Sequence, residues 1–348
     1  MRSVGLDLHK VNTQVCEVDE EGTVVREVRI ATGREHLAKL FGRRERLRIL
    51  VESATESEWV ARYLEELGHE VIVADPGYAP MYPHRVRSVK TDRRDARALA
   101  EACRTGTYRK AHRCSETNRR VRRELTVREA LVRTRSRYVS IVRSTLRSEG
   151  FRVRSGAAST FVARVEELEL PGHIEKVIEP LQEQMNNLTA HVKEMDRALS
   201  TIAGTDEIIR RLCTAPGVGP VTATAFKAVV DRVERFESAH ELESYLGLVP
   251  GERSSGEKRL RGHLTKRGNV RARWLLVEVA WVILRGAGGP RGRGLEAWSQ
   301  RIAARRGKRI AAAALARRIA GILYAMWRDG TEFQAGKIRL PQGKLKVA

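Results

Sequence analysis

The first third of the chain alternates short β-rich runs with amphipathic helical runs. The predicted elements are strands at residues 3–9, 13–18 and 23–30, a helix at 35–44, a strand at 47–51 that leads into Glu52, a helix at 57–67 and a strand at 70–74. Turn-like residues separate the first three strands, which predicts a meander. A meander followed by strand, helix and strand indicates a mixed α/β sheet.

The middle of the chain has a different pattern from its two ends. Residues 117–149 and 174–202 are long, helical and densely charged, and two such helices predict an antiparallel coiled-coil arm. From about residue 206, Gly and Pro punctuate several shorter helices, and a polar tail follows Gly330. The predicted domains are 1–110, the arm at 111–203, a mostly helical domain at 204–330 and the tail at 331–348.

The balance of charge narrows the class of partner. Apolar residues make up 42% of the 348 residues, which excludes a wholly disordered chain. Lys and Arg number 65 against 43 acidic residues, and the net charge of +22 is spread along the chain. This much positive charge predicts a polyanionic partner, and nucleic acid bound through many phosphates fits best.

The cysteines and the hydropathy indicate the compartment. Cys16, Cys103, Cys114 and Cys213 lie far apart, with no CxxC and no paired histidine spacing, so neither a disulfide framework nor a zinc site is predicted. We expect reduced, mostly buried thiols. No run approaches the roughly 18 apolar residues of a membrane span, so we expect a cytoplasmic protein without a membrane partner.

Four acidic residues are candidates for a metal site. Asp7 lies in a predicted strand on the same face as Gly5, and Glu52 ends a second strand, where open α/β sheets place ligand-binding groups. Asp92 and Asp95 share one face of the first turn of a predicted helix. Taken alone, this pair has an ordinary explanation, because acidic residues favour helix N-termini and Asp92 could be an N-cap.

Taken together, the four acids predict a magnesium centre. They supply the hard oxygen ligands that Mg²⁺ prefers, and phosphoryl transfer needs metal ions to neutralise the attacking and leaving oxygens. Combined with the charge of +22, they indicate a metal-dependent enzyme that cuts DNA. His9 could tune this site, although a simple hydrogen-bonding histidine is the more ordinary interpretation.

These acidic segments also resemble a known family. GLDLHK, LVESAT and VKTDRRDARALA resemble the RuvC-like DEDD domain of the one-ten family of insertion-sequence transposases, which includes the Piv-type invertases. The C-terminal half resembles that family's second transposase domain. The resemblance implies an RNase H-like fold with Asp7, Glu52, Asp92 and Asp95 as the metal-binding acids. It also implies a noncoding bridge RNA that pairs with target and donor DNA.

A serine doublet lies in the C-terminal half, within LGLVPGERSSGEKRLRGHL, followed by a helix from about Asn269. From the residues alone, Ser254 and Ser255 are ordinary loop serines, because no local base activates them. The resemblance implies that Ser255, immediately before Gly256, attacks DNA and forms a 5′-phosphoserine link. Ser254 is the fallback, since the doublet leaves the register open by one.

Several residues near this motif are candidate nucleic-acid contacts. The PGVGP turn, with Gly217 and Gly219, resembles a helix-hairpin-helix that offers backbone amides to phosphate, and a tight interhelical turn packed in the core is the alternative. Arg271 and Arg273 could clamp phosphate or lie on a solvated helix face. The other basic candidates are Arg253, Lys258, Arg259, Arg261, Lys266 and Arg267.

The combined prediction is a DNA transposase and recombinase with a serine nucleophile and a DEDD magnesium cluster. Its expected partners are target DNA, donor DNA and a guide RNA, and the exposed arm predicts a dimer or tetramer in the bacterial cytoplasm, associated with the nucleoid. Two alternatives stay open. One is a RuvC-like junction-resolving nuclease that uses water, and the other is a non-catalytic nucleic-acid scaffold whose acids are structural.

Overall fold

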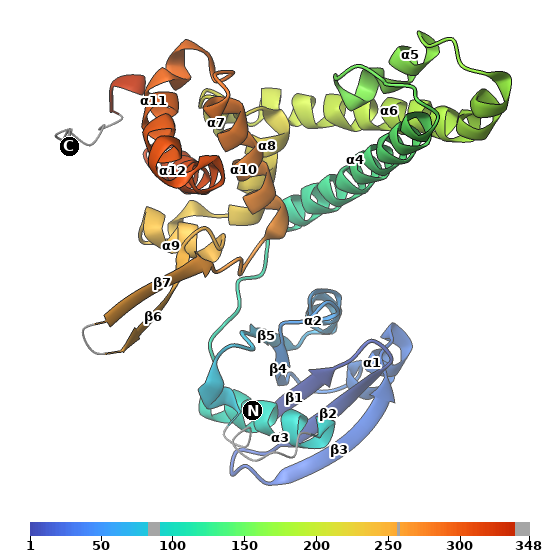
Figure 1. Ribbon diagram of the computed structural model, residues 1–348. Coiled ribbons are helices and arrows are strands. Elements are labelled where there is room, and N and C mark those ends of the chain that lie inside the picture. Colours follow the sequence, from blue (N-terminus) through green and yellow to red (C-terminus); the bar gives the residue numbers. More distant parts are fainter. Residues whose placement is uncertain (83–90, 256–257, 338–348) are drawn as a thin grey trace. The chain divides into compact units, whose positions relative to one another are not determined.

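The computed structural model describes residues 1–82, 91–255 and 258–337, and for 252–255, 258–261 and 337 it describes the backbone alone (Figure 1). The chain divides into two compact units, Met1–Cys114 and Ser115–Ala348. The acidic segments belong to the first unit and the serine doublet to the second. Each unit has its own hydrophobic core.

The first unit is built on a five-stranded mixed sheet. Its strands, in spatial order, are β3 (Val24–Ala31), β2 (Asn12–Val18), β1 (Ser3–Leu8), β4 (Arg48–Glu52) and β5 (Glu70–Ala74). The first three are antiparallel neighbours, whereas β4 lies parallel to β1 and β5 parallel to β4. The predicted meander and mixed α/β sheet are confirmed.

Helices cover both faces of this sheet (Figure 1). α1 (Arg34–Phe41) and α2 (Ser57–Glu66) pack on the face that carries Leu6 and Val51, and α3 (Asp92–Thr105) packs on the other face. The two-residue period of β1 therefore sends Leu6 into one core and Gly5 and Asp7 towards α3. A short 3-10 turn, η1 (Ala79–Met81), precedes α3 in the chain.

The second unit begins with two long helices. α4 (Glu116–Ser148) and α6 (Gly172–Thr205) pack against each other, joined by an ion pair between Arg128 and Asp196. The short elements η3 (Ala158–Thr160) and α5 (Phe161–Glu166) lie between them in the chain, and Phe161 is fully buried. The two predicted long helices are confirmed, and the coiled coil stays a prediction.

The rest of the second unit is mostly helical, with one β-hairpin. Its elements are α7 (Glu207–Leu212), α8 (Pro220–Val230), η4 (Val233–Arg235), α9 (Ala239–Tyr245), β6 (Pro250–Ser255), β7 (Lys258–Leu264), α10 (Val270–Leu284), α11 (Gly289–Arg306), α12 (Lys308–Arg328) and η5 (Ala335–Lys337). The predicted helix start near Asn269 is confirmed, since Asn269 caps α10, and α8 begins directly at Pro220.

α12 is the central helix of this core. It is long and apolar enough, by length and composition only, to cross a membrane, which corrects the expectation that no segment approaches that limit. Half of its apolar stretch is buried, and Leu315, Ile319 and Tyr324 are among its fully covered residues. A helix buried in this way is the ordinary core helix of a helical domain.

A buried aspartate ties the start of α4 to the end of α8. Asp231 accepts hydrogen bonds from the backbone amide and hydroxyl of Ser115 and from the side-chain amide of Asn118. Its φ is +65°, and Arg232 donates to the carbonyl of Val230 across it, which is a strained γ-turn. Three donors therefore hold a backbone conformation that a non-glycine residue rarely adopts.

Candidate metal centre and serine hairpin

Two adjacent strands position the first two acids. Leu6 and Val51 are the last registered pair of the parallel β1–β4 ladder, and Asp7 and Glu52 follow them by one residue each. Neighbouring positions on parallel strands share a face, so both carboxylates belong to the same edge of the sheet. Glu52 accepts a hydrogen bond from the hydroxyl of Tyr82.

The helix α3 positions the other two acids. Thr91 is its N-cap and accepts a hydrogen bond from the amide of Arg94 at 3.3 Å. Asp92 is therefore the first helical residue, and the alternative that Asp92 is an N-cap is wrong. Asp95 lies one turn further along and is buried, with 8% of its surface exposed.

Gly5 lets this helix lie unusually close to the sheet. A Cβ atom at Gly5 would lie 2.2 Å from the carbonyl oxygen of Ala96 and 2.3 Å from the amide nitrogen of Ala100. Both atoms are backbone, so no side chain can move aside to make room. The glycine two residues before Asp7 thus sets the distance between Asp7 and the acids of α3.

Asp7, Asp92 and His9 form the tightest group. One ligand atom of each lies within 4.8 Å of the others. His9 Nε2 is 3.3 Å from Asp7 Oδ2 and 3.4 Å from Asp92 Oδ1, so the imidazole bridges two of the expected metal ligands. Glu52 and Asp95 are not part of this 4.8 Å group. These contacts fit the interpretation of His9 as a hydrogen-bonding histidine, and a role for it in tuning a metal site stays a prediction.

The electrostatics show that the acids crowd one another. Burial raises the pKa of Asp7, the neighbouring His9 opposes that rise, and the charges of Asp95 and Asp92 add to it. Asp95 therefore acts on Asp7 although it lies outside the tightest group. Carboxylates that disfavour one another's ionised form are the usual protein ligands of a hard divalent cation, which offsets their repulsion.

Glu27, an acid of β3 that sequence reasoning missed, ties α3 to the sheet. Glu27 of β3 accepts hydrogen bonds from Arg93 and Arg97, the basic neighbours of Asp92 and Asp95 in the chain. The hydrogen bonds from Arg97 and Arg93 lower the pKa of Glu27 to about 2. Because Glu27 lies 66 residues from Arg93, no local sequence pattern could have paired them.

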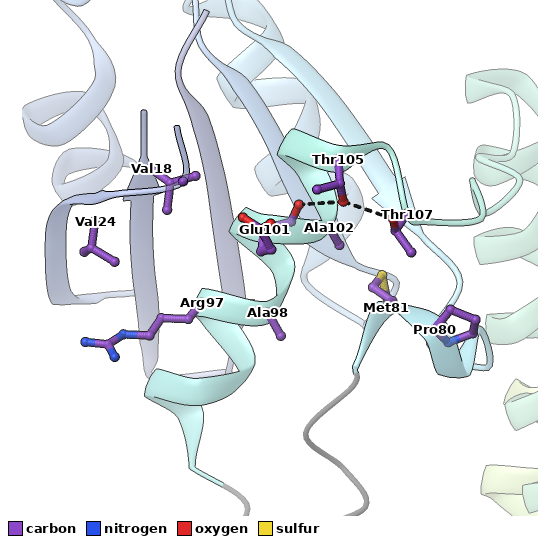
Figure 2. Close-up of a pocket in the computed structure, with 11 residues that line it drawn as sticks. Val18, Val24, Pro80, Met81, Arg97, Ala98, Glu101, Ala102, Thr105 and Thr107 are labelled. Atoms are coloured by element: carbon purple, nitrogen blue, oxygen red, sulfur yellow. Dashed lines mark hydrogen bonds between the residues drawn. The ribbon is translucent and has the colours of Figure 1, made fainter. Parts of the chain in front are cut away.

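A surface cavity of about 440 Å³ lies on the same side of the sheet (Figure 2). Its lining comes from the β2–β3 turn, from η1 and from the C-terminal half of α3, and includes Val18, Met81, Ala98 and Thr105. None of the four acids, all of which are described, contributes to the lining. The cavity is therefore separate from the acidic site.

The serine doublet ends one strand of the β6–β7 hairpin. In the backbone register Ser255 pairs with Lys258 and Ser254 with Arg259. Figure 1 shows the hairpin extending from the helices of its unit. Gly256 lies outside the described residues, as do the side chains of Ser254, Ser255, Arg253, Lys258, Arg259 and Arg261, so their proposed contacts stay predictions.

The base of this hairpin is held by close backbone packing. Gly247 has a φ of +69°, and a Cβ there would lie 2.0 Å from the carbonyl oxygen of Arg267. Arg273 donates to the carbonyl oxygens of Leu246 at 2.9 Å and Arg267 at 3.3 Å, which joins the two ends of the hairpin. Burial lowers the pKa of Arg273, in keeping with this internal position.

The two arginines of α10 therefore make internal contacts. Arg271 forms an ion pair with Glu129 and donates to Thr126, both on α4. Neither Arg271 nor Arg273 lies on a plain solvated helix face, so that alternative is wrong. Their proposed contact with phosphate stays a prediction, whereas Lys266 and Arg267 are exposed at the hairpin base.

The PGVGP turn joins α7 to α8 and packs on a neighbouring helix. Gly219 is the N-cap of α8, and Gly217 has a φ of +70°. A Cβ at Gly217 would lie 3.3 Å from Val279 Cγ1 of α10, and Val218 is buried. These contacts favour the packed interhelical turn, and contact with phosphate through this turn stays a prediction.

Comparison with known proteins identifies the family. Residues 4–149 match a DEDD transposase model of the IS110 type, and residues 209–293 match the model described as the transposase IS116/IS110/IS902 family. A Sinorhizobium fredii protein, y4qE, described as a transposase, is 30% identical over 293 residues, which cover 80% of this chain and 70% of that relative. The chain belongs to the IS116/IS110/IS902 transposase family.

Other similar proteins extend over nearly the whole length of this transposase. A Pseudomonas aeruginosa protein described as a probable family 20 transposase is 29% identical over 339 residues, or 96% of this chain and 98% of the relative. The transposase for insertion sequence element IS1111A of Coxiella burnetii is 26% identical over 341 residues, or 97% and 92% of the two chains. The family resemblance drawn from the sequence motifs is confirmed.

The match also bears on the acidic site. The DEDD transposase model spans Asp7, Glu52, Asp92 and Asp95, which supports a divalent metal at the cluster described above. The second model spans the β6–β7 hairpin. This transposase is thus an enzyme that acts on DNA, as its charge and acidic motifs predicted.

Proposed function

We propose that this transposase cuts and rejoins DNA strands with Ser255 as nucleophile and with Mg²⁺ held by Asp7, Glu52, Asp92 and Asp95. The observation that carries the metal half of the proposal is the convergence of Asp7 and Asp92 on one imidazole, with Asp95 close enough to raise the pKa of Asp7. The resemblance of the second unit to the family's second transposase domain supports Ser255 as the nucleophile. Ser254 is the fallback nucleophile.

The donor set suits magnesium. All four residues offer carboxylate oxygens, and a site rich in like charge favours a hard divalent ion over a neutral ligand. When bound, the metal neutralises charge on phosphodiester oxygens. His9 is then a positioning residue, because its Nε2 lies between Asp7 and Asp92 and orients both carboxylates.

The serine step conserves the phosphodiester energy. The Ser255 hydroxyl gives up its proton as its Oγ attacks phosphorus, a P–O bond to the serine forms, the P–O3′ bond breaks, and the released 3′ oxygen takes up a proton. A 3′ hydroxyl then attacks the 5′-phosphoserine, and the serine regains its proton. The step needs no nucleotide cofactor, because the bond that is broken is replaced by one of similar energy.

The partners and the assembly form part of the same proposal. The net charge of +22 along the chain supports long contacts with target and donor DNA and with a noncoding guide RNA. The packed pair α4 and α6 is the proposed coiled-coil arm of a dimer or tetramer. We place the protein in the bacterial cytoplasm, at the nucleoid.

The serine half is tested by covalent trapping. Ser255→Ala should abolish the covalent protein–DNA adduct with labelled donor DNA and guide RNA, whereas Ser254→Ala, its matched neighbour, should retain it. Loss only in Ser254→Ala moves the nucleophile by one residue. If Ser255→Ala and Ser254→Ala both keep cutting DNA, the serine proposal is wrong and the water-using junction-resolving nuclease takes its place.

The metal half is tested by Asp7→Asn. We expect this variant to lose calorimetric Mg²⁺ binding and strand exchange together, because one ligand and one negative charge are gone. Glu66→Gln is a suitable control, since that exposed carboxylate pairs only distantly, at 4.0 Å, with Arg34. Unchanged strand exchange in Asp7→Asn would show that the acids are structural and would favour the scaffold alternative.

A further inference from the structure

A dense basic cluster surrounds the turn between α11 and α12. From residue 297 to residue 328 the chain contains no acidic residue, although it contains eight basic ones. Three of the eight are engaged within the unit: Arg317 pairs with Glu243, Arg318 lies over the ring of Trp298, and Arg328 pairs with Asp329. The other five gather at the turn itself.

These five residues are exposed and form what we call the α11–α12 corner. Within the part of the chain that the structure describes, no ion pair joins any of them to a carboxylate. Unbalanced charges at such a density repel one another, and an external anion would offset that repulsion. The members of the corner are Arg301, Arg305, Arg306, Lys308 and Arg309.

The first turn of α12 departs from the usual charge pattern of a helix. Its N-cap, Gly307, has no side chain that could accept a hydrogen bond from the first backbone amides of the helix. No acidic residue lies in the first turn. Lys308 and Arg309 stand there instead, where their charge opposes the positive end of the helix dipole. A 21-residue helix with free amides and two cations at its start is arranged for an external anion.

The type of anion can be inferred from the aromatic side chains near the basic residues. Trp298 is the aromatic residue nearest in the chain, and Arg318 lies over its ring at 4.6 Å. One face of that ring is therefore occupied, and Trp298 packs partly buried against the core of its unit, so the corner itself carries cations and no aromatic residue. Proteins that bind single strands combine positive charge with aromatic side chains on which the bases stack, whereas a duplex is held through its phosphates, so basic residues without aromatic ones favour the duplex.

We propose that the α11–α12 corner binds the phosphate backbone of duplex DNA outside the catalytic residues. The proposal rests on the proposed function only in that DNA is the substrate. It assigns a binding role to a surface distant in sequence from the serine hairpin and from the PGVGP turn. Contact is with phosphate rather than with bases, so the site is not sequence-specific.

The test measures duplex binding by the full-length protein across a salt series. Arg305→Gln combined with Arg306→Gln should weaken binding and reduce the slope of log affinity against log salt by about 2, because each lost phosphate contact removes about 0.9. Lys308→Gln combined with Arg309→Gln, on the other side of Gly307, should give the same reduction.

The matched control removes two exposed arginines that already have partners. Arg120 pairs with Glu116, and Arg154 pairs with Glu167. Arg120→Gln combined with Arg154→Gln therefore lowers the net charge by the same amount and leaves the α11–α12 corner unchanged. An equal drop in the control pair would mean that only net charge matters and would overturn the proposal. A drop seen with RNA duplex but not with DNA would overturn it as well.

The two proposals fail separately. Salt-dependent binding needs no covalent step, so Ser255→Ala should keep the full slope while losing the adduct. If the corner variants keep the slope and the adduct forms normally, the corner proposal is wrong and the serine proposal stands.

Discussion

At the scale of single residues, the geometry of the acidic site depends on the absence of a side chain at Gly5. The carbonyl of Ala96 and the amide of Ala100 occupy the space that any side chain at position 5 would need. The alternation of β1 predicts that Gly5 and Asp7 share a face, but it does not predict how close the facing helix lies. The sequence therefore predicts which acids face this helix, and it does not predict the spacing between them.

Gly5→Ala should inactivate the enzyme although all four acids remain in the sequence. The added methyl group would push α3 away from β1, and with it Asp92 and Asp95, and would destabilise the first unit by about 1–3 kcal/mol through overpacking. Isothermal calorimetry with Mg²⁺ and a strand-exchange assay should both show loss.

Gly33→Ala is the matched control for this experiment. Its Cβ would lie 3.6 Å from the nearest atom, His36 Nδ1, which is an ordinary contact in the same unit. Normal Mg²⁺ binding by Gly5→Ala would show that the helix can shift without disturbing the site, and the spacing argument would fail.

At the scale of elements, the strands and helices were largely predictable, because each has a clear hydrophobic period. One exception is the end of α1, which stops at Phe41, before the predicted Arg44, with Gly42 as its C-cap. The tie between Glu27 and α3 was not predictable, since the chain separates its members by 66 residues. The local preference of a segment for helix or strand does not predict which distant residues will contact it.

Glu27→Gln should destabilise the first unit in a pH-dependent way. The ordinary pKa of this carboxyl is 4.5, and in the folded chain it is about 2. Its stabilising contribution is therefore complete above pH 4.5 and is lost as the pH falls towards 2. At neutral pH we expect a melting temperature lower by roughly 2–4 °C in the variant.

The difference between wild type and Glu27→Gln should shrink as the pH is lowered through that window, when both are melted over a pH series. Glu66→Gln, which removes an exposed acid from the same unit, should show little difference at any pH. A difference that stays constant from neutral pH to about pH 2 would show that the ion pairs to Arg93 and Arg97 are not its source.

At the scale of the whole molecule, the chain consists of two compact units that join at Cys114 and Ser115. The expected thiol burial is confirmed for Cys16, Cys103 and Cys114. Burial raises the pKa of Cys16 and of Cys103 to about 11.

The hydrophobic pattern predicted an α/β part followed by helical parts. It could not predict the buried γ-turn at Asp231, because a single polar residue leaves no periodic signal.

Asp231→Ala should destabilise the second unit selectively. It leaves the donors of Ser115 and Asn118 without their acceptor, and the expected cost is about 1–3 kcal/mol. Differential scanning calorimetry should show two transitions, of which only one moves. Asp231→Asn, which keeps an acceptor oxygen, should move it less. If both transitions shift, the effect of Asp231 is not confined to the second unit and the prediction is wrong.

The lack of room for a side chain at Gly5 also bears on whether a copy of the gene encodes an active enzyme. A copy of the gene that is judged only by its four acidic residues would pass as intact. A single base change converts a glycine codon to an alanine codon, and here the resulting protein would retain Asp7, Glu52, Asp92 and Asp95 yet be unable to bring them together. Position 5 therefore belongs beside the acids when an active copy is to be told from a decayed one.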